Sequence, residues 1–276
     1  MLGPGDYVVR KSYNRDILFK IIEIETIKRG LKEKAKLKGI SYRVLADAPL
    51  EDLEPTEGMR FGLKETNTML KIERNVKEII TQRRKEALNP SLQKTVKVLH
   101  IDGDIFYLNL CMKYYEILGI DAIGEHIVEE SQPQQIQQML EKYKPSILVL
   151  TGHDSLHKGA TDLSDNQSYK NSEHFINAVK KARMLMPTSE QLIIFAGACQ
   201  SNFEEILDKG ADYAASPKRV LIHALDPVFM IERIVHCPFY KVLTVENALQ
   251  YTITGKEGLG GYEVLGRLRK GGPVFL

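Results

Sequence analysis

Two side chains capable of covalent catalysis each follow an uninterrupted apolar run. His153 comes directly after the strand-like stretch around Ile147–Leu150, and Cys199 comes directly after Leu192–Phe195. Continuous apolar runs are typical of parallel strands covered on both faces, and chemistry in such sheets lies beyond the carboxyl ends of the strands. An imidazole beside a thiol can take up its proton and later protonate a leaving amine. The pair therefore predicts thiol-dependent cleavage of an amide bond.

Either residue alone would be weak evidence, because a histidine can be a satisfied loop residue and a cysteine can fill a turn. The combination is stronger. Their spacing is close to the roughly 50 residues that separate histidine and cysteine in caspases. Small residues such as Gly197 surround Cys199, and the helix predicted to begin after it would favour a thiolate. Gly152 lets the chain turn sharply before His153. The backbone N–H of Cys199 could donate to the oxyanion.

Four further polar residues are candidates for support or substrate binding. Asp154 could orient His153 or pair with a basic substrate side chain. Asp162 and Asp165 lie in the polar loop 158–168, where they could form an anionic pocket for an arginine or be a plainly solvated loop. Ser216 ends the next predicted strand and could line the specificity pocket.

A second reading starts from the pair Asp102 and Asp104 at another strand end. Two close carboxylates could hold Mg²⁺ or form an acid pocket, although Asp104 as a helix N-cap explains the same residues. The alternative function is thus a non-enzymatic flavodoxin-like or receiver-like domain joined to a docking barrel. The histidines have no metal-ligand spacing, so we expect no metal site and no cofactor.

The region 94–276 must position these residues. Its apolar runs alternate with amphipathic stretches, which predicts an α/β three-layer sandwich around a mainly parallel sheet, caspase-like or flavodoxin-like. The helices are expected at these ranges: 105–118, 134–143 with Ser131 as its cap, 171–185 and 201–207. The glycine-rich C-terminal segment is expected to form an extended flap or hairpin.

The preceding chain divides into two parts. Residues 1–57 predict a small SH3-like β-barrel of five strands, with a basic turn over 28–39. The residues expected to line it are Val8, Val9, Ile22, Ile24, Tyr42 and Val44. Residues 58–93 predict a helical connector with Met69, Leu70 and Ile72 among its apolar positions. Such a barrel binds a peptide or RNA, or holds a neighbouring domain.

Composition excludes several classes of protein. The 276 residues carry 38 basic and 36 acidic side chains, so the net charge of +2 does not favour a nucleic-acid or membrane-surface protein. No apolar run approaches the roughly 18 to 20 residues of a membrane span, and the first residues lack a secretory signal. Three scattered cysteines do not make a disulfide framework, which predicts a reduced, cytosolic protein.

The two apolar blocks, one followed by Gly-His-Asp and the other by Gly-Ala-Cys-Gln, resemble the caspase–clostripain–gingipain clan of cysteine proteases. In that clan a glycine whose amide helps form the oxyanion hole usually follows the histidine. Asp154 stands there in this chain, which leaves the second oxyanion donor open.

The whole chain also resembles the sporulation-specific YabG protease family. The stretches that carry this resemblance are GDYVVRKSYNRDILFKI, HIDGDIFYL, LGIDAIGEHIVEESQP, LVLTGHDS, FAGACQSNFEEILDKGADYAASPKRVLIHALDP and GGYEVLGRLRKGG. The resemblance implies a cysteine endopeptidase with Cys199 as nucleophile and His153 as base. It further implies spore coat, cortex and morphogenetic proteins as substrates, cleaved next to arginine or other basic residues, and a place in the mother-cell cytoplasm at the developing spore coat.

Overall fold

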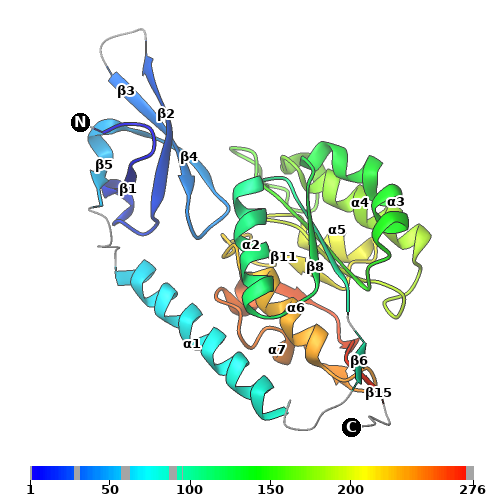
Figure 1. The fold of residues 1–276 in the computed structure, drawn as a ribbon. Coiled ribbons are helices and arrows are strands. Elements are labelled where there is room, and N and C mark those ends of the chain that lie inside the picture. Colours follow the sequence, from blue (N-terminus) through cyan, green and yellow to red (C-terminus); the bar gives the residue numbers. More distant parts are fainter. Residues whose placement is uncertain (1, 28–31, 57–62, 87–91, 95, 272–276) are drawn as a thin grey trace. The chain divides into compact units, whose positions relative to one another are not determined.

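The fold is taken from a computed structural model that describes residues 2–27, 32–56, 63–86, 92–94 and 96–271. The chain forms two compact units, Met1–Asn75 and Val76–Leu276, and the boundary between them falls within helix α1 (Leu63–Glu86). Figure 1 shows the helices and strands of each unit.

The N-terminal unit is built on one antiparallel five-stranded sheet in the order β4-β3-β2-β1-β5. Its elements are β1 (Tyr7–Arg10), η1 (Lys11–Tyr13), β2 (Phe19–Ile27), β3 (Lys32–Gly39), β4 (Leu45–Pro49), η2 (Leu50–Asp52) and β5 (Leu53–Pro55). The predicted β-rich N-terminal region is therefore confirmed.

Two details of that prediction are wrong. The basic stretch expected as a turn contains strand β3, in which Ala35 and Leu37 are buried while Lys36 between them is exposed. This period of two is the strand signal, and the many lysines obscured it. Ile22, expected in the core, is 48% exposed because a β-bulge shifts the register between Ile21 and Glu23.

The second unit contains a six-stranded sheet in the order β13-β11-β10-β9-β7-β8. The strands are β7 (Val98–Asp102), β8 (Ala122–His126), β9 (Ile147–Thr151), β10 (Ile193–Ala196), β11 (Tyr213–Ala215) and β13 (Leu259–Gly261). All neighbouring pairs are parallel except β11 with β13, which is antiparallel. The mainly parallel sheet expected from the apolar runs is thus confirmed.

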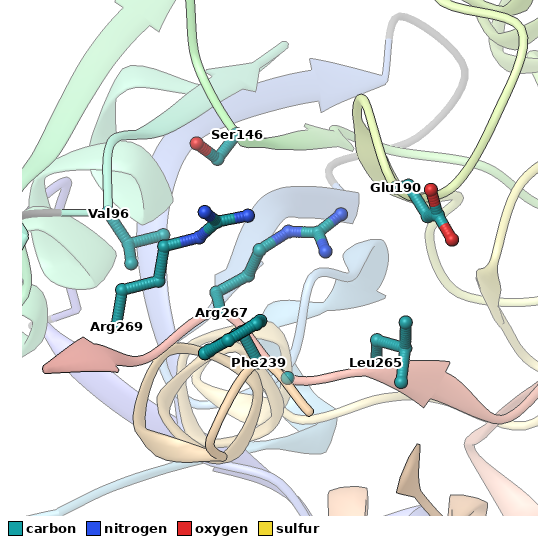
Figure 2. A pocket seen from close by; sticks show the side chains of 8 residues that line it. Val96, Ser146, Glu190, Phe239, Leu265, Arg267 and Arg269 are labelled. Carbon is teal, nitrogen blue, oxygen red and sulfur yellow. The ribbon is translucent and has the colours of Figure 1, made fainter. Parts of the chain in front are cut away.

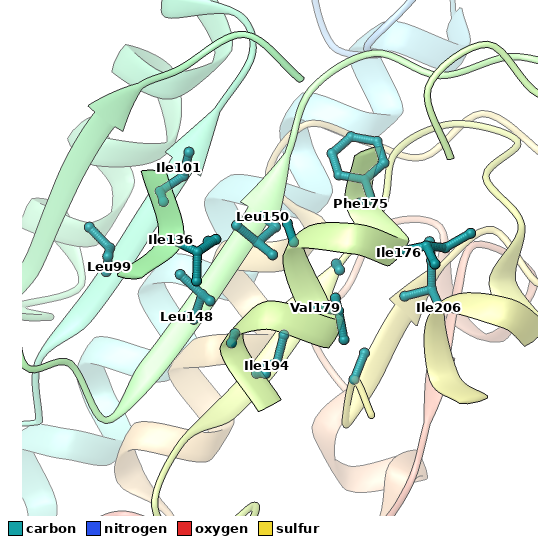
Figure 3. Close-up of a cluster of buried hydrophobic side chains, with 14 of the residues drawn as sticks. Leu99, Ile101, Ile136, Leu148, Leu150, Phe175, Ile176, Val179, Ile194 and Ile206 are labelled. Carbon is teal, nitrogen blue, oxygen red and sulfur yellow. The ribbon is translucent and has the colours of Figure 1, made fainter. Parts of the chain in front are cut away.

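Helices cover both faces of this sheet (Figure 1). They are α2 (Ile105–Ile117), α3 (Gln132–Tyr143), α4 (Ser172–Leu185), α5 (Phe203–Asp208), α6 (Asp226–His236) and α7 (Val245–Ala248), with short helices η3 (Glu129–Ser131), η4 (Asn166–Ser168) and η5 (Gly255–Glu257). Side chains of α3, α4 and α5 pack with those of β7, β9 and β10 in one buried cluster (Figure 3). Helix α2 covers the opposite face, where His100 contacts Tyr115.

The element boundaries differ from expectation at two places. Helix α3 begins at Gln132, ahead of the predicted start, and Ser131 makes no side-chain capping bond. The C-terminal segment, expected as an extended flap or hairpin packed near the catalytic domain, contributes strand β13 to the main sheet. Two further pairs complete the unit, β12 (Val242–Leu243) with β14 (Val264–Leu265) and β6 (Leu92–Lys94) with β15 (Arg269–Gly271). No helix within the described ranges is both long and apolar enough to span a membrane.

Candidate active site

The carboxyl edge of the main sheet gathers the candidate residues. Strands β9 and β10 are parallel neighbours, with Leu150 opposite Ala196, so the chain segments that carry His153 and Cys199 leave the sheet side by side. On the other side of β9, strand β7 pairs Asp102 with Thr151 and brings Asp104 to the same edge. The sequence order alone did not fix this adjacency.

Cys199 lies in the turn between β10 and α5 and is only 1% exposed. Its sulfur accepts a hydrogen bond from the backbone N–H of Ile222 at 3.3 Å, and the Ile222 carbonyl lies 3.8 Å away. All three cysteines are thiols rather than disulfides. The sulfur is thus covered by polar backbone of the segment that follows β11.

His153 is held at four points. Its Nε2 lies 2.8 Å from Oδ2 of Asp104, and its backbone N–H donates to Oε1 of Glu129 at 2.6 Å. Its carbonyl accepts from Asn171, and its ring meets the Tyr107 ring edge-on at a centroid distance of 5.7 Å. The ring remains half-buried rather than sealed.

Asp104 is indeed the N-cap of α2, since its Oδ1 accepts from the backbone N–H of Phe106 at 2.9 Å. Its own N–H donates to Oδ1 of Asp102 at 2.9 Å. Asp102 in turn accepts from the hydroxyl of Thr151. The two carboxylates weighed as a magnesium site are therefore engaged in a buried hydrogen-bond network.

The position of the Glu129 carboxylate explains why residue 152 is a glycine. A Cβ atom built on Gly152 would lie 2.2 Å from Oε1 of Glu129, and one on Gly103 would lie 2.3 Å from the same oxygen. Both contacts are far below van der Waals separation. The two glycines therefore make the space in which the Glu129 carboxylate reaches the backbone of His153.

Asp154 is turned away from the role of orienting His153. Its carboxylate accepts hydrogen bonds from the hydroxyls of Ser172 and Ser201 and from the backbone N–H groups of Asn171 and Ser155. Burial raises the pKa of Asp154, although these hydrogen bonds act in the opposite direction. The residue ties the loop after β9 to the loop after β10, while Asp104 is the carboxylate at the imidazole.

The other predicted residues fall into separate roles. Asp162 and Asp165 accept bonds from their own loop, at Ser164 and Gln167, and are exposed. Ser216 is buried and its hydroxyl joins Gln200 to Val220 by accepting from one and donating to the other. Gly197 has a φ of +109°, which a residue with a side chain rarely adopts. None of these contacts is with His153 or Cys199.

The sequence model of the family described as YabG peptidase U57 matches residues 3–273. The chain belongs to the YabG peptidase family. It is also similar to the sporulation-specific protease YabG of Bacillus subtilis (strain 168), with 39% identity over an alignment that covers 98% of this chain and 97% of the relative.

Membership of the YabG family decides between the two functional readings, because it is a peptidase family and not a family of non-enzymatic binding domains. Sequence reasoning missed two contributors to the site. Glu129 lies in a short helix after β8 and carries no motif, and the Ile222 contact depends on how the chain folds back after β11. In the sequence, only Gly103 and Gly152 indicated that another side chain must lie close to the backbone at these positions.

Two cavities of this YabG-family peptidase differ in their relation to the strand ends. One, of about 450 Å³, borders the Cys199 side of the sheet and is lined by Leu163, Ser164, Asn202, Glu204, Glu205, Pro217, Lys218 and Arg219. The other, of about 400 Å³, opens at the amino ends of the strands, where Arg267 and Arg269 point into it (Figure 2). Only the first belongs to the edge that carries the candidate catalytic residues.

Proposed function

We propose that this chain is a cysteine endopeptidase in which Cys199 is the nucleophile and His153 the proton carrier. The observation that carries the proposal is the parallel pairing of β9 with β10, which delivers both residues to one edge of the sheet. The hydrogen bond from the Ile222 N–H to the sulfur also favours the thiolate over the thiol. Peptidase membership supplies the reaction class.

The reaction proceeds in two stages. The proton of Cys199 passes to His153, the sulfur adds to the scissile carbonyl carbon, and the N–H of Cys199 donates to the oxyanion. Collapse breaks the C–N bond, and the imidazolium gives its proton to the leaving amine. Water deprotonated by His153 then attacks the thioester, which releases the acid and restores the thiol.

Substrate access requires movement, since Cys199 is 1% exposed. The covering segment runs from Ser216 to Ile222, and it is held by the Ser216 hydroxyl and by the contact of Ile222 with the sulfur. We assign this segment as the part that a substrate peptide displaces. The peptide would then replace the Ile222 backbone beside the sulfur.

The 450 Å³ cavity supports cleavage next to a basic residue. Glu204 lines it and is 67% exposed at its side chain, where Arg219 now donates to it. A substrate arginine could replace Arg219 at that carboxylate with the same charge-assisted bond. We further propose spore coat, cortex and morphogenetic proteins as substrates and the mother-cell cytoplasm as the location. The name of the Bacillus subtilis relative, a sporulation-specific protease, supports a role in sporulation.

For the domains we propose an SH3-like barrel at 1–57, a helical connector at 58–93 and a caspase-like catalytic domain at 94–276. Strand order β4-β3-β2-β1-β5, with the short helix η2 between β4 and β5, supports the first. The parallel core of the sheet with catalytic candidates at its carboxyl edge supports the third.

The test is cleavage of a peptide with one internal arginine. C199A and H153A should each abolish turnover while the circular dichroism spectrum and melting temperature stay near those of the wild type. C237A, which removes a half-exposed thiol elsewhere, is the matched control and should retain activity. Turnover by C199A at the wild-type rate would remove the proposal.

A further inference from the structure

We propose that Asp104 is the residue that positions His153 for proton transfer, so that the site is a Cys–His–Asp triad; this rests on the proposed function. The contact is direct, since Oδ2 of Asp104 lies 2.8 Å from Nε2 of His153. The Asp104 side chain is 8% exposed and that of His153 is 22% exposed. Partial burial strengthens such a charge-assisted bond relative to one in water.

The Asp104 carboxylate is oriented before it meets the imidazole. One oxygen caps α2 at Phe106, and the backbone N–H of Asp104 is held by Asp102. Asp102 is fixed by the Thr151 hydroxyl, which also lies 2.7 Å from Nε2 of the buried His100. A rigid network therefore joins the ends of β7 and β9 beneath the catalytic imidazole.

This geometry assigns the two ring nitrogens of His153. A carboxylate can only accept, so Nε2 carries the hydrogen and donates it to Asp104. Nδ1 is then the nitrogen that receives the proton of Cys199 and returns it to the leaving amine. The negative charge of Asp104 also stabilises the imidazolium that exists between these two transfers.

The experiment separates this role from helix capping. Asparagine and serine both cap helices well, but asparagine lacks the charge and serine is too short to reach the ring. D104N and D104S should therefore melt near the wild type. D104S should lose roughly 100-fold in kcat, within the range for an impaired acid–base group. D104N should also lower kcat, because its neutral amide cannot stabilise the imidazolium.

A second readout does not depend on turnover. In C199A, the ¹⁵N spectrum of neutral His153 should show the hydrogen on Nε2, and in C199A/D104S that preference should disappear. D208N, a change of the same kind at an exposed aspartate at the far end of α5, is the matched control and should alter neither readout.

The outcomes distinguish the two proposals. Wild-type kcat in both D104N and D104S, with H153A inactive, would overturn the triad and leave the dyad standing. The Nδ1–H tautomer in C199A would also overturn it, even if the Asp104 variants failed to fold. Activity in C199A would instead remove the cysteine mechanism itself.

Discussion

The backbone N–H of Ile222 donates to the sulfur of Cys199 at 3.3 Å, and the two residues lie on different sides of strand β11 in the sequence. The contact places a donor where a thiolate gains from it. It also places the chain over the sulfur. The same residue thus supplies a hydrogen-bond donor to the sulfur and restricts access to it.

The segment from Ser216 to Ile222, which covers Cys199, should open more often in the variant S216A. S216A removes two hydrogen bonds that hold the segment, to Val220 and from Gln200. A hydrogen bond is worth about 1 kcal/mol net, so opening should become roughly fivefold more frequent per bond. Iodoacetamide labelling of Cys199, measured in a C237A background, should accelerate accordingly. S12A, in the N-terminal unit, is the control, and equal labelling rates in both variants would contradict the cover.

Gly152 can be tested against Glu129 by a double-mutant cycle. G152A places a methyl group where the Glu129 carboxylate sits, which should break its bond to the His153 backbone and lower kcat/KM by roughly 100-fold. E129A empties that space, so the double variant should be less active than the wild type but no worse than G152A alone. Strictly additive losses would show that the two residues do not share the space.

The buried Asp154 should make stability depend on pH. Its folded-state pKa is raised, chiefly by burial, so the stability it contributes is present below its unfolded pKa and is lost as pH rises through the folded value. D154N cannot ionise. The melting temperature of D154N minus that of the wild type should therefore become more positive from about pH 4 upward. A difference that is flat or falls with pH would contradict this sign.

Glu204 should contribute to the choice of a basic residue. E204Q keeps the shape of the cavity and removes the charge, so kcat/KM for an arginine peptide should fall roughly fivefold, as expected for an exposed ion pair. The same peptide with a neutral residue in place of arginine should be cleaved equally by both enzymes. Equal loss on both peptides would place Glu204 outside substrate selection.

Much of this site could be predicted from the sequence pattern alone. Apolar runs mark the buried strands, and catalytic and binding residues in such sheets lie after the carboxyl ends of the strands. That reasoning placed His153 and Cys199 after the ends of two buried neighbouring strands, and it predicted the helix cap at Asp104, which is confirmed. It could not assign the carboxylate at the imidazole, since the contact of Asp104 with His153 depends on β7 lying beside β9. The nearer residue, Asp154, was the natural choice by sequence and is used elsewhere.

Local pattern also failed where geometry intervened. A single bulge in β2 exposed Ile22, and a lysine-rich strand was mistaken for a turn. No local sequence pattern predicted that β13 belongs to the main sheet. A short glycine-rich segment becomes a strand only through pairing with a neighbour, here β11.

The antiparallel pairing of β11 with Leu259–Gly261 has a consequence for biosynthesis. His153, Cys199 and β11 are synthesised before Leu259–Gly261, so β11 is an unpaired sheet edge until β13 has been made. Nascent copies on one messenger could join through it. A variant shortened ahead of Leu259 should therefore be recovered as aggregates rather than as an inactive monomer.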